Sequence, residues 1–159
     1  MNRTNARRIL LLAPIIFLAH FLEESNGFVP WFNAHVARGI TEPLFWSVNF
    51  TALAITIAVV AIEWLSKSAQ SALVVVTWLS FLMLANALFH IAGALHDGSY
   101  MPGLITAVSL YLPFCAVVAR QLRAERRVSS GALATAAALG ALPMLVHGYL
   151  IVFRHSRLF

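Results

Sequence analysis

The chain has 159 residues, of which 60% are hydrophobic and only 11% are charged, and its formal net charge is +5. Soluble globular domains are about 45–50% apolar and about 25% charged, so this composition excludes an ordinary soluble domain and predicts an integral membrane protein. The positive charges lie in short segments between apolar runs rather than in a separate basic domain. We therefore expect membrane lipids as surroundings and no nucleic-acid partner.

Five apolar segments follow the basic N-terminal stretch, and each is near the roughly 20 residues that a membrane-spanning helix needs. The predicted spans are residues 9–28, 44–65, 72–95, 103–119 and 132–153. The first segment passes into Glu23 and Glu24 without a clear cleavage site, so we interpret it as a span rather than a secretory signal. Residues 31–43 are predicted to form a polar connection and residues 96–99 a turn. The sequence therefore predicts an all-α fold, a polytopic membrane helix bundle of about five transmembrane helices in one domain.

The distribution of lysine and arginine predicts the orientation of the bundle, because cytoplasmic segments carry an excess of these residues. With the N-terminus inside, the cytoplasmic segments contain Arg3, Arg7, Arg8, Lys67, Arg120, Arg123, Arg126 and Arg127. The outer segments then contain Arg38, Arg154 and Arg157. We therefore expect a cytoplasmic N-terminus and, after five spans, a C-terminus on the outer side.

The first span contains three ionisable side chains, His20, Glu23 and Glu24. A charged group at the centre of the bilayer costs roughly 2.5–3.5 kcal/mol, so such groups usually face the bundle interior and have partners there. Positions i, i+3 and i+4 project from one side of a helix. In the third span, Asn86 and His90 share a face in the same way. The two helices can therefore turn their polar faces toward each other.

Depth along the helices favours a single site in the outer half of the membrane. With a helical rise of about 1.5 Å per residue, His20 lies about 16 Å, Asn86 about 21 Å and His147 about 22 Å from the cytoplasmic start of its span. By the same measure His90 lies about 27 Å up its span, and Asn49 is about 7 Å below the outer surface. In a hydrocarbon core about 30 Å thick, these residues share one band.

Imidazole and carboxylate groups are ligands that suit a divalent transition metal such as zinc, iron or manganese. The predicted metal ligands are His20, Glu23, Glu24, His90 and His147. A His-x-x-Glu pair occurs once, so a mononuclear site is favoured over a dinuclear one. We expect Glu23 and Glu24 to divide the roles of ligand and catalytic acid or base. Asn86 would lie behind the ligands or on the substrate, Asn49 supplies another carboxamide, and Tyr100 is predicted to be an interfacial aromatic beside a turn.

Other interpretations of the same residues stay open. Two adjacent carboxyl groups in a medium of low dielectric constant are also suited to acid–base catalysis without metal. Chains of glutamate and histidine inside membranes are also common in proton or ion relays. A lone histidine on an apolar helix, such as His147, is more often a hydrogen-bonded core residue than a ligand. These alternatives predict different functions for one polar site.

The ordered motifs resemble those of the HXXEE family of bacterial membrane proteins. The motif that names the family is matched by His20-x-x-Glu23-Glu24, followed by Asn86-Ala-Leu-Phe-His90, Tyr100-Met-Pro102-Gly103-Leu-Ile-Thr106 and Pro113. The resemblance runs from Leu12 to about Pro113. It implies a small multi-pass protein of the bacterial inner membrane. It implies no particular activity, because the family is uncharacterised.

From the residues themselves, the leading hypothesis is a membrane-embedded metal-dependent enzyme that acts on a lipid or another apolar small molecule. The alternatives are a small transporter or proton-coupled carrier, and an accessory membrane subunit with a structural polar network. Small size and the lack of an internal repeat argue mildly against a monomeric transporter. The sequence leaves open whether the bundle is a homo-oligomer.

Overall fold

The computed structural model of the chain describes residues 6–36 and 38–154. Over these residues the secondary structure is helical and no strand is found, which confirms the predicted all-α fold. In chain order the elements are α1 (Ala6–Leu10), α2 (Ala13–Glu24), α3 (Phe28–His35), α4 (Glu42–Ser66), α5 (Ala69–Leu79), η1 (Ser80–Ala85), α6 (Asn86–Asp97), α7 (Leu104–Thr106), η2 (Ala107–Tyr111), α8 (Leu112–Ala124) and α9 (Ser130–Arg154). The two η elements are π-helical segments inside longer helices.

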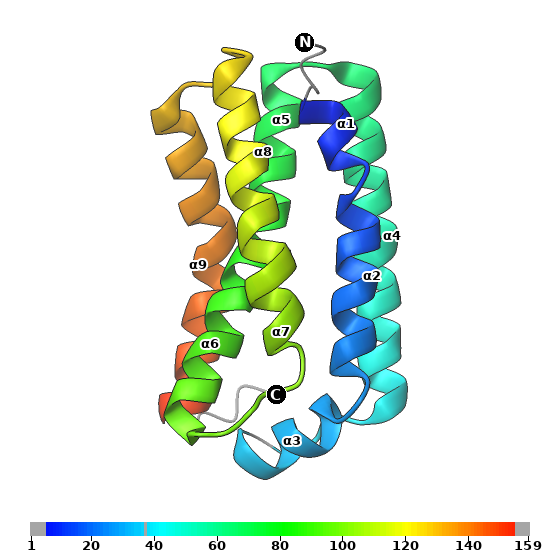
Figure 1. Cartoon of the computed structure of the whole chain (residues 1–159), viewed down its shortest axis with the longest axis vertical. Coiled ribbons are helices and arrows are strands. Elements are labelled where there is room, and N and C mark those ends of the chain that lie inside the picture. Colours follow the sequence, from blue (N-terminus) through cyan, green and yellow to red (C-terminus); the bar gives the residue numbers. More distant parts are fainter. Residues whose placement is uncertain (1–5, 37, 155–159) are drawn as a thin grey trace.

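Four continuous helical stretches are long and apolar enough to cross a membrane. They are Glu42–Ser66, Ala69–Asp97, Leu104–Ala124 and Ser130–Leu150. The helices run up and down one long axis, and α3 lies across one end of the bundle, which we call the α3 end (Figure 1). The connection from α6 to α7 lies at the α3 end, whereas the α4–α5 and α8–α9 connections lie at the opposite end. This alternation is the one expected for helices that cross a membrane in succession, and the side that faces the cytoplasm stays a prediction.

The first predicted span is not one continuous helix over residues 9–28, which corrects the sequence-based boundary. A turn at Leu11 and Leu12 separates α1 from α2, and Leu12 N–H donates to Ile9 O at 3.0 Å. Pro14, at the start of α2, has no N–H to donate, and in an unbroken helix its ring would clash with the carbonyl four residues earlier. The two helices nevertheless follow one another along α4 (Figure 1).

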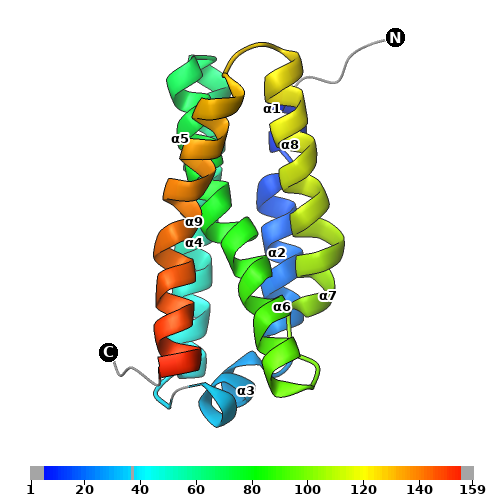
Figure 2. The ribbon, with the colours of Figure 1, turned by 90° about the vertical axis from the view of Figure 1, so that its left-hand side faces the viewer.

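A second correction concerns residues 31–43, which the sequence predicted to be a polar connection. The chain breaks after α2 at Gly27, whose φ of 132° is in the left-handed region, and then forms helix α3. The loop that follows is fixed by Asn33, whose side chain accepts from Gly39 N–H at 2.9 Å and donates to Ile40 O at 2.7 Å. Helix α3 covers the end of the bundle next to the last turn of α2 (Figures 1 and 2).

The two π-helical segments lie beside the polar residues of the bundle. η1 ends where Asn86 begins α6, four residues before His90, and η2 contains Tyr111, whose side chain is fully buried. Such bulges are rare, and they are found frequently at functional sites. Each one locally changes which residues of its helix face the bundle interior, and both occur in helices that contribute to the site described below.

Helix α9 packs closely on α5 and η1 because a glycine lies at the crossing. A Cβ atom added to Gly140 would lie 2.0 Å from the carbonyl oxygen of Thr77. Small residues let neighbouring helix backbones approach in this way, as expected for the alanine-rich start of the last span. This contact fixes the side of α9 that faces the bundle.

At the end opposite α3, a buried carboxylate joins two connections. Glu63 is 1% exposed, accepts from the Ser71 hydroxyl at 2.5 Å, and forms an ion pair with Arg127. Arg127 also donates to the carbonyl of Ser68 at 2.7 Å. The sequence analysis named Arg127 only as a cytoplasmic charge, whereas the structure pairs it with the buried Glu63. This network ties the α4–α5 turn to the α8–α9 connection.

Candidate metal centre

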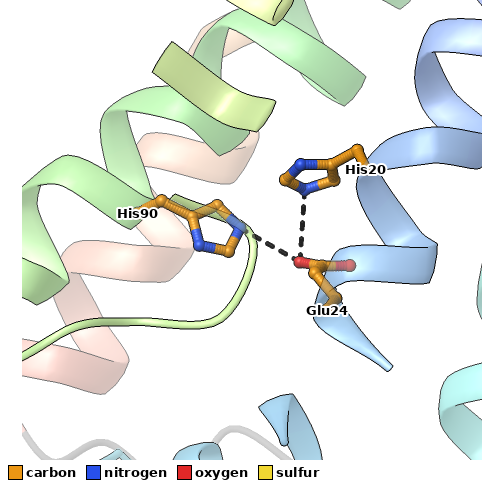
Figure 3. A group of neighbouring side chains, drawn as sticks. All are labelled: His20, Glu24 and His90. Carbon is orange, nitrogen blue, oxygen red and sulfur yellow. Dashed lines mark hydrogen bonds and ion pairs between the residues drawn. The ribbon is translucent and has the colours of Figure 1, made fainter. Parts of the chain in front are cut away.

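Two imidazoles and one carboxylate meet inside the bundle (Figure 3). His20 and Glu24 are one turn apart on α2, and His90 reaches them from α6. Oε1 of Glu24 lies 3.3 Å from Nε2 of His20 and 3.0 Å from Nε2 of His90. The three ligand atoms lie within 4.8 Å of one another, and the residues are 0%, 4% and 0% exposed. This arrangement could hold a metal ion.

Aromatic rings hold the two imidazoles in place. The ring of Tyr111 in η2 lies 4.3 Å from that of His20, and the two histidine rings meet edge-on at 5.0 Å. Phe28, at the start of α3, lies 6.1 Å from the ring of His90. The imidazole planes are therefore fixed by packing as well as by hydrogen bonds.

The second nitrogen of His20 has a polar partner on another helix. Nδ1 of His20 lies 2.8 Å from the hydroxyl oxygen of Thr106. The same hydroxyl lies 2.5 Å from Oε2 of Glu23. Hydrogen bonds thus connect His20, Thr106 and Glu23 in a continuous chain that leads away from the three possible ligands. In the sequence, Thr106 lies in the segment that resembles the family, and its surroundings there indicate no role for it.

Glu23 binds the start of the next helix rather than the group of three ligand atoms. Its carboxylate accepts from the Tyr100 hydroxyl at 2.5 Å, Ile105 N–H at 3.1 Å and Thr106 N–H at 2.8 Å, in addition to the Thr106 hydroxyl. The first N–H groups of a helix have no partners within the helix. A carboxylate at this end accepts hydrogen bonds from them, and its negative charge interacts favourably with the helix dipole. The predicted role of Glu23 as a metal ligand is therefore not supported by its position.

The connection between α6 and α7 closes the site from the α3 end. Met101, Pro102 and Gly103 are all buried. Gly103 has φ +97°, and a Cβ atom added to it would lie 2.6 Å from Cε1 of His90 and 2.8 Å from Cγ of Glu24. Only a residue without a side chain allows the backbone so close to the ligands. Partial burial and the hydrogen bond to Glu23 raise the pKa of Tyr100, in the same connection, to about 12.

Several buried polar atoms around the three possible ligands have no hydrogen-bond partner among the described residues. They are Nε2 of His20, Nδ1 of His90, Oδ1 of Asn86 and the hydroxyl of Tyr111. Buried polar atoms in folded proteins usually have partners. Nε2 of His20 lies next to the carboxylate of Glu24, and this position fits a cation placed between the nitrogen and the oxygen.

Two other residues predicted for the site, Asn49 and His147, lie elsewhere. Asn49 donates to the carbonyl of Phe45 on its own helix, at 3.0 Å. His147 lies on α9, which packs against α5, η1 and α6, and it is outside the group of three ligands. In the view of Figure 1, α6 stands between α9 and α2. Equal depth in the membrane therefore does not bring His147 to Glu24, because the facing of α9 is set by its packing on α5 and η1.

Comparison with known proteins agrees with the motifs. No curated protein and no solved structure matches the chain. A family model described as "Protein of unknown function with HXXEE motif" matches residues 11–118. The matched range contains His20, Glu24 and His90, together with Glu23 and Thr106, and it ends before α9. The chain therefore belongs to the HXXEE family, and the motif of that family supplies two of the three possible ligands described above.

Proposed function

We propose that this protein is an integral protein of the cell membrane that binds one divalent transition metal ion through Nε2 of His20, Nε2 of His90 and the carboxylate of Glu24. The observation that carries the proposal is the convergence of these three ligand atoms within 4.8 Å, in fully buried surroundings. Two imidazoles and a carboxylate are the donor set that zinc, iron and manganese accept. The hydrogen bond at Nδ1 of His20 supports it further, because ligating histidines usually donate their second N–H to a polar group.

The proposed activity is that of a metal-dependent enzyme acting on a lipid or another apolar substrate. Three protein ligands are typical of catalytic metal sites, in which a further position stays open for water or substrate. A bound metal of this kind supplies a Lewis acid and lowers the pKa of a coordinated water. Glu24 would hold the ion. The hydroxyl of Tyr111, which has no hydrogen-bond partner among the described residues, lies in the same buried region.

An apolar cavity beside α6 favours an apolar substrate, although none of the three proposed ligands lines it. The cavity, of about 170 Å³, lies between α6 and α9 and is lined by residues including Leu88, Phe89, Met144, Leu145 and Tyr149. Phe89 precedes His90 in the chain, and the two rings are 6.0 Å apart.

Metal analysis of the purified protein tests the site. The protein would be prepared in detergent without chelator, and metal per chain measured by mass spectrometry of the elements. We expect about one ion per chain in the wild type and loss of the ion in His20→Ala, His90→Ala and Glu24→Ala. His147→Ala is the matched control and should keep the metal. A wild type without stoichiometric metal, or unchanged metal in His20→Ala and His90→Ala, would overturn the proposal.

The enzymatic part has its own test. Metal-loaded and chelator-stripped protein would be incorporated into vesicles of mixed phospholipids, and the lipids analysed by mass spectrometry over time. We expect new lipid products only with the metal-loaded wild type, and none with Glu24→Gln. Identical lipid profiles in all samples would contradict an action on phospholipids while leaving the metal site intact.

A second candidate function is a proton-coupled carrier, and one specific observation favours it. Hydrogen bonds run without a gap from His20 through Thr106 and Glu23 to Tyr100, which is 52% exposed. Such a row joins the buried site to the surface at the α3 end, and rows of this kind serve as proton relays in membranes. Proton flux into protein-containing vesicles that requires Glu23 would support this candidate, whereas flux that survives Glu23→Gln would count against it.

A further inference from the structure

The hydroxyl of Thr106 has one proton to donate, and its neighbours determine where that proton goes. Glu23 already accepts two backbone N–H groups, which can only donate, and this favours the ionised carboxylate, which can only accept. The Thr106 hydroxyl lies 2.5 Å from Glu23 Oε2 and 3.3 Å from the carbonyl of Gly103, and both are acceptors. In either case the proton of Thr106 points away from His20.

The proton between Thr106 and His20 must therefore come from the imidazole. Nδ1 of His20, 2.8 Å from the hydroxyl oxygen, acts as the donor. A neutral imidazole that carries its proton on Nδ1 has its lone pair on Nε2. That lone pair faces Oε1 of Glu24 at 3.3 Å, and Nε2 has no hydrogen-bond partner among the described residues. A lone pair and a carboxylate side by side are suited to sharing a cation.

We propose that Thr106 and Glu23 are positioning residues that fix the tautomer of His20, so that its Nε2 lone pair is directed at the metal position. Glu23 orients the hydroxyl of Thr106, Thr106 accepts the Nδ1 proton, and His20 is left with a single ligating nitrogen. The two glutamates of the motif thus have different tasks, since Glu24 binds the ion and Glu23 acts through Thr106. The metal-binding half of this inference rests on the proposed function, whereas the tautomer of His20 does not.

The chain offers a matched set of variants for the test. Thr106→Val keeps the shape of the side chain and removes the hydroxyl, and Thr106→Ser restores a hydroxyl. Tyr100→Phe is the control. Tyr100 donates to Oε1 of Glu23, whereas Thr106 donates to Oε2, so the Tyr100 hydroxyl is not part of the link between Glu23 and His20. Thermal unfolding of each variant in detergent shows whether it is folded.

The first measurement is the tautomer of His20 in metal-free protein, read from nitrogen NMR of histidine-labelled samples, with His20→Gln identifying the signal. We expect the proton on Nδ1 in the wild type, Thr106→Ser and Tyr100→Phe, and its transfer to Nε2 or a mixture in Thr106→Val. A proton on Nε2 in the wild type, or the same tautomer in Thr106→Val, would overturn the inference, whether or not the protein binds metal.

The second measurement is metal affinity in competition with a chelator. Loss of the group that orients a ligating histidine typically weakens binding roughly 10- to 100-fold, and we expect that loss in Thr106→Val, recovery in Thr106→Ser, and little change in Tyr100→Phe. Equal affinity of Thr106→Val and the wild type would refute the positioning role while leaving the metal site in place. A wild type without metal would instead refute the proposed function, and the NMR result would still decide the tautomer.

Discussion

Nε2 of His90 lies 3.0 Å from Oε1 of Glu24, although 66 positions separate the two residues in the chain. This contact joins α2 to α6 at a place where both side chains are buried. Glu24 also lies 3.3 Å from Nε2 of His20 on its own helix, so both imidazoles face one carboxylate oxygen. Removing that carboxylate would take away the partner of His90 and the group that Nε2 of His20 faces, and this makes Glu24 the central residue of the site.

Gly103→Ala should disrupt the site much more than a comparable change elsewhere in the same connection. The new Cβ would meet Cε1 of His90 at 2.6 Å and Cγ of Glu24 at 2.8 Å. Gly98→Ala is the control, because Gly98 also has a positive φ, of 64°, but open space around its Cβ position. Each alanine costs roughly 1–2 kcal/mol of backbone strain, and only Gly103→Ala should also reduce metal content. Equal metal content in the two variants would contradict this prediction.

Tyr100 should titrate at unusually high pH and weaken the fold as it does so. Its pKa is raised to about 12 by partial burial and by the hydrogen bond to Glu23, from an ordinary value of 10.0. The folded state therefore holds this proton more tightly than the unfolded state, so the stabilisation is complete below about pH 10 and is lost as the pH rises toward about 12. We expect the stability difference between wild type and Tyr100→Phe to shrink over this range. A constant difference in melting temperature from neutral pH to pH 12 would refute the assignment.

Much of the fold follows from the sequence because the thickness of the membrane sets the length of each apolar run. The long helices Glu42–Ser66 and Ser130–Leu150 lie where hydropathy predicted them. The break before Pro14 and the helix after Gly27 were not predicted. A proline can either kink or interrupt a helix in a membrane, and neighbouring helices decide between these outcomes. Hydropathy carries no information on that choice.

The site could be predicted only in part, for a related reason. His20, Glu24 and His90 are expensive to bury without partners, so their presence in apolar runs already indicates a shared site. His147 has the same depth, but the facing of α9 depends on the contact between Gly140 and Thr77, which no local pattern specifies. Thr106 was assigned no role because a hydroxyl can bond to its own helix and so needs no distant partner. Its position in the first turn after Pro102 and Gly103 was the available signal.

Gly140→Ala should destabilise the packing of α9. An alanine in a helix is ordinarily more stable than glycine by roughly 0.5–1 kcal/mol, but here the added Cβ would lie 2.0 Å from the Thr77 carbonyl oxygen, which belongs to backbone and cannot rotate away. Gly131→Ala in the same helix has open space and is the control. We expect a lower melting temperature in detergent for Gly140→Ala and an equal or higher one for Gly131→Ala. The reverse order would mean that α9 does not pack on α5 as described.

Arg127→Met should be among the most destabilising single changes at the end opposite α3. It removes the cation that neutralises Glu63, whose side chain is 1% exposed and is also bound by Ser71. Breaking a buried ion pair by removing one partner typically costs about 3–5 kcal/mol, because the remaining charge stays buried and uncompensated. The double variant Arg127→Met with Glu63→Gln should recover much of this loss, since no charge is then left inside. Arg123→Met, at an exposed position in the same basic segment, is the control and should change the melting temperature little. If the double variant were as unstable as Arg127→Met alone, the loss would come from packing of the arginine side chain rather than from the unpaired carboxylate.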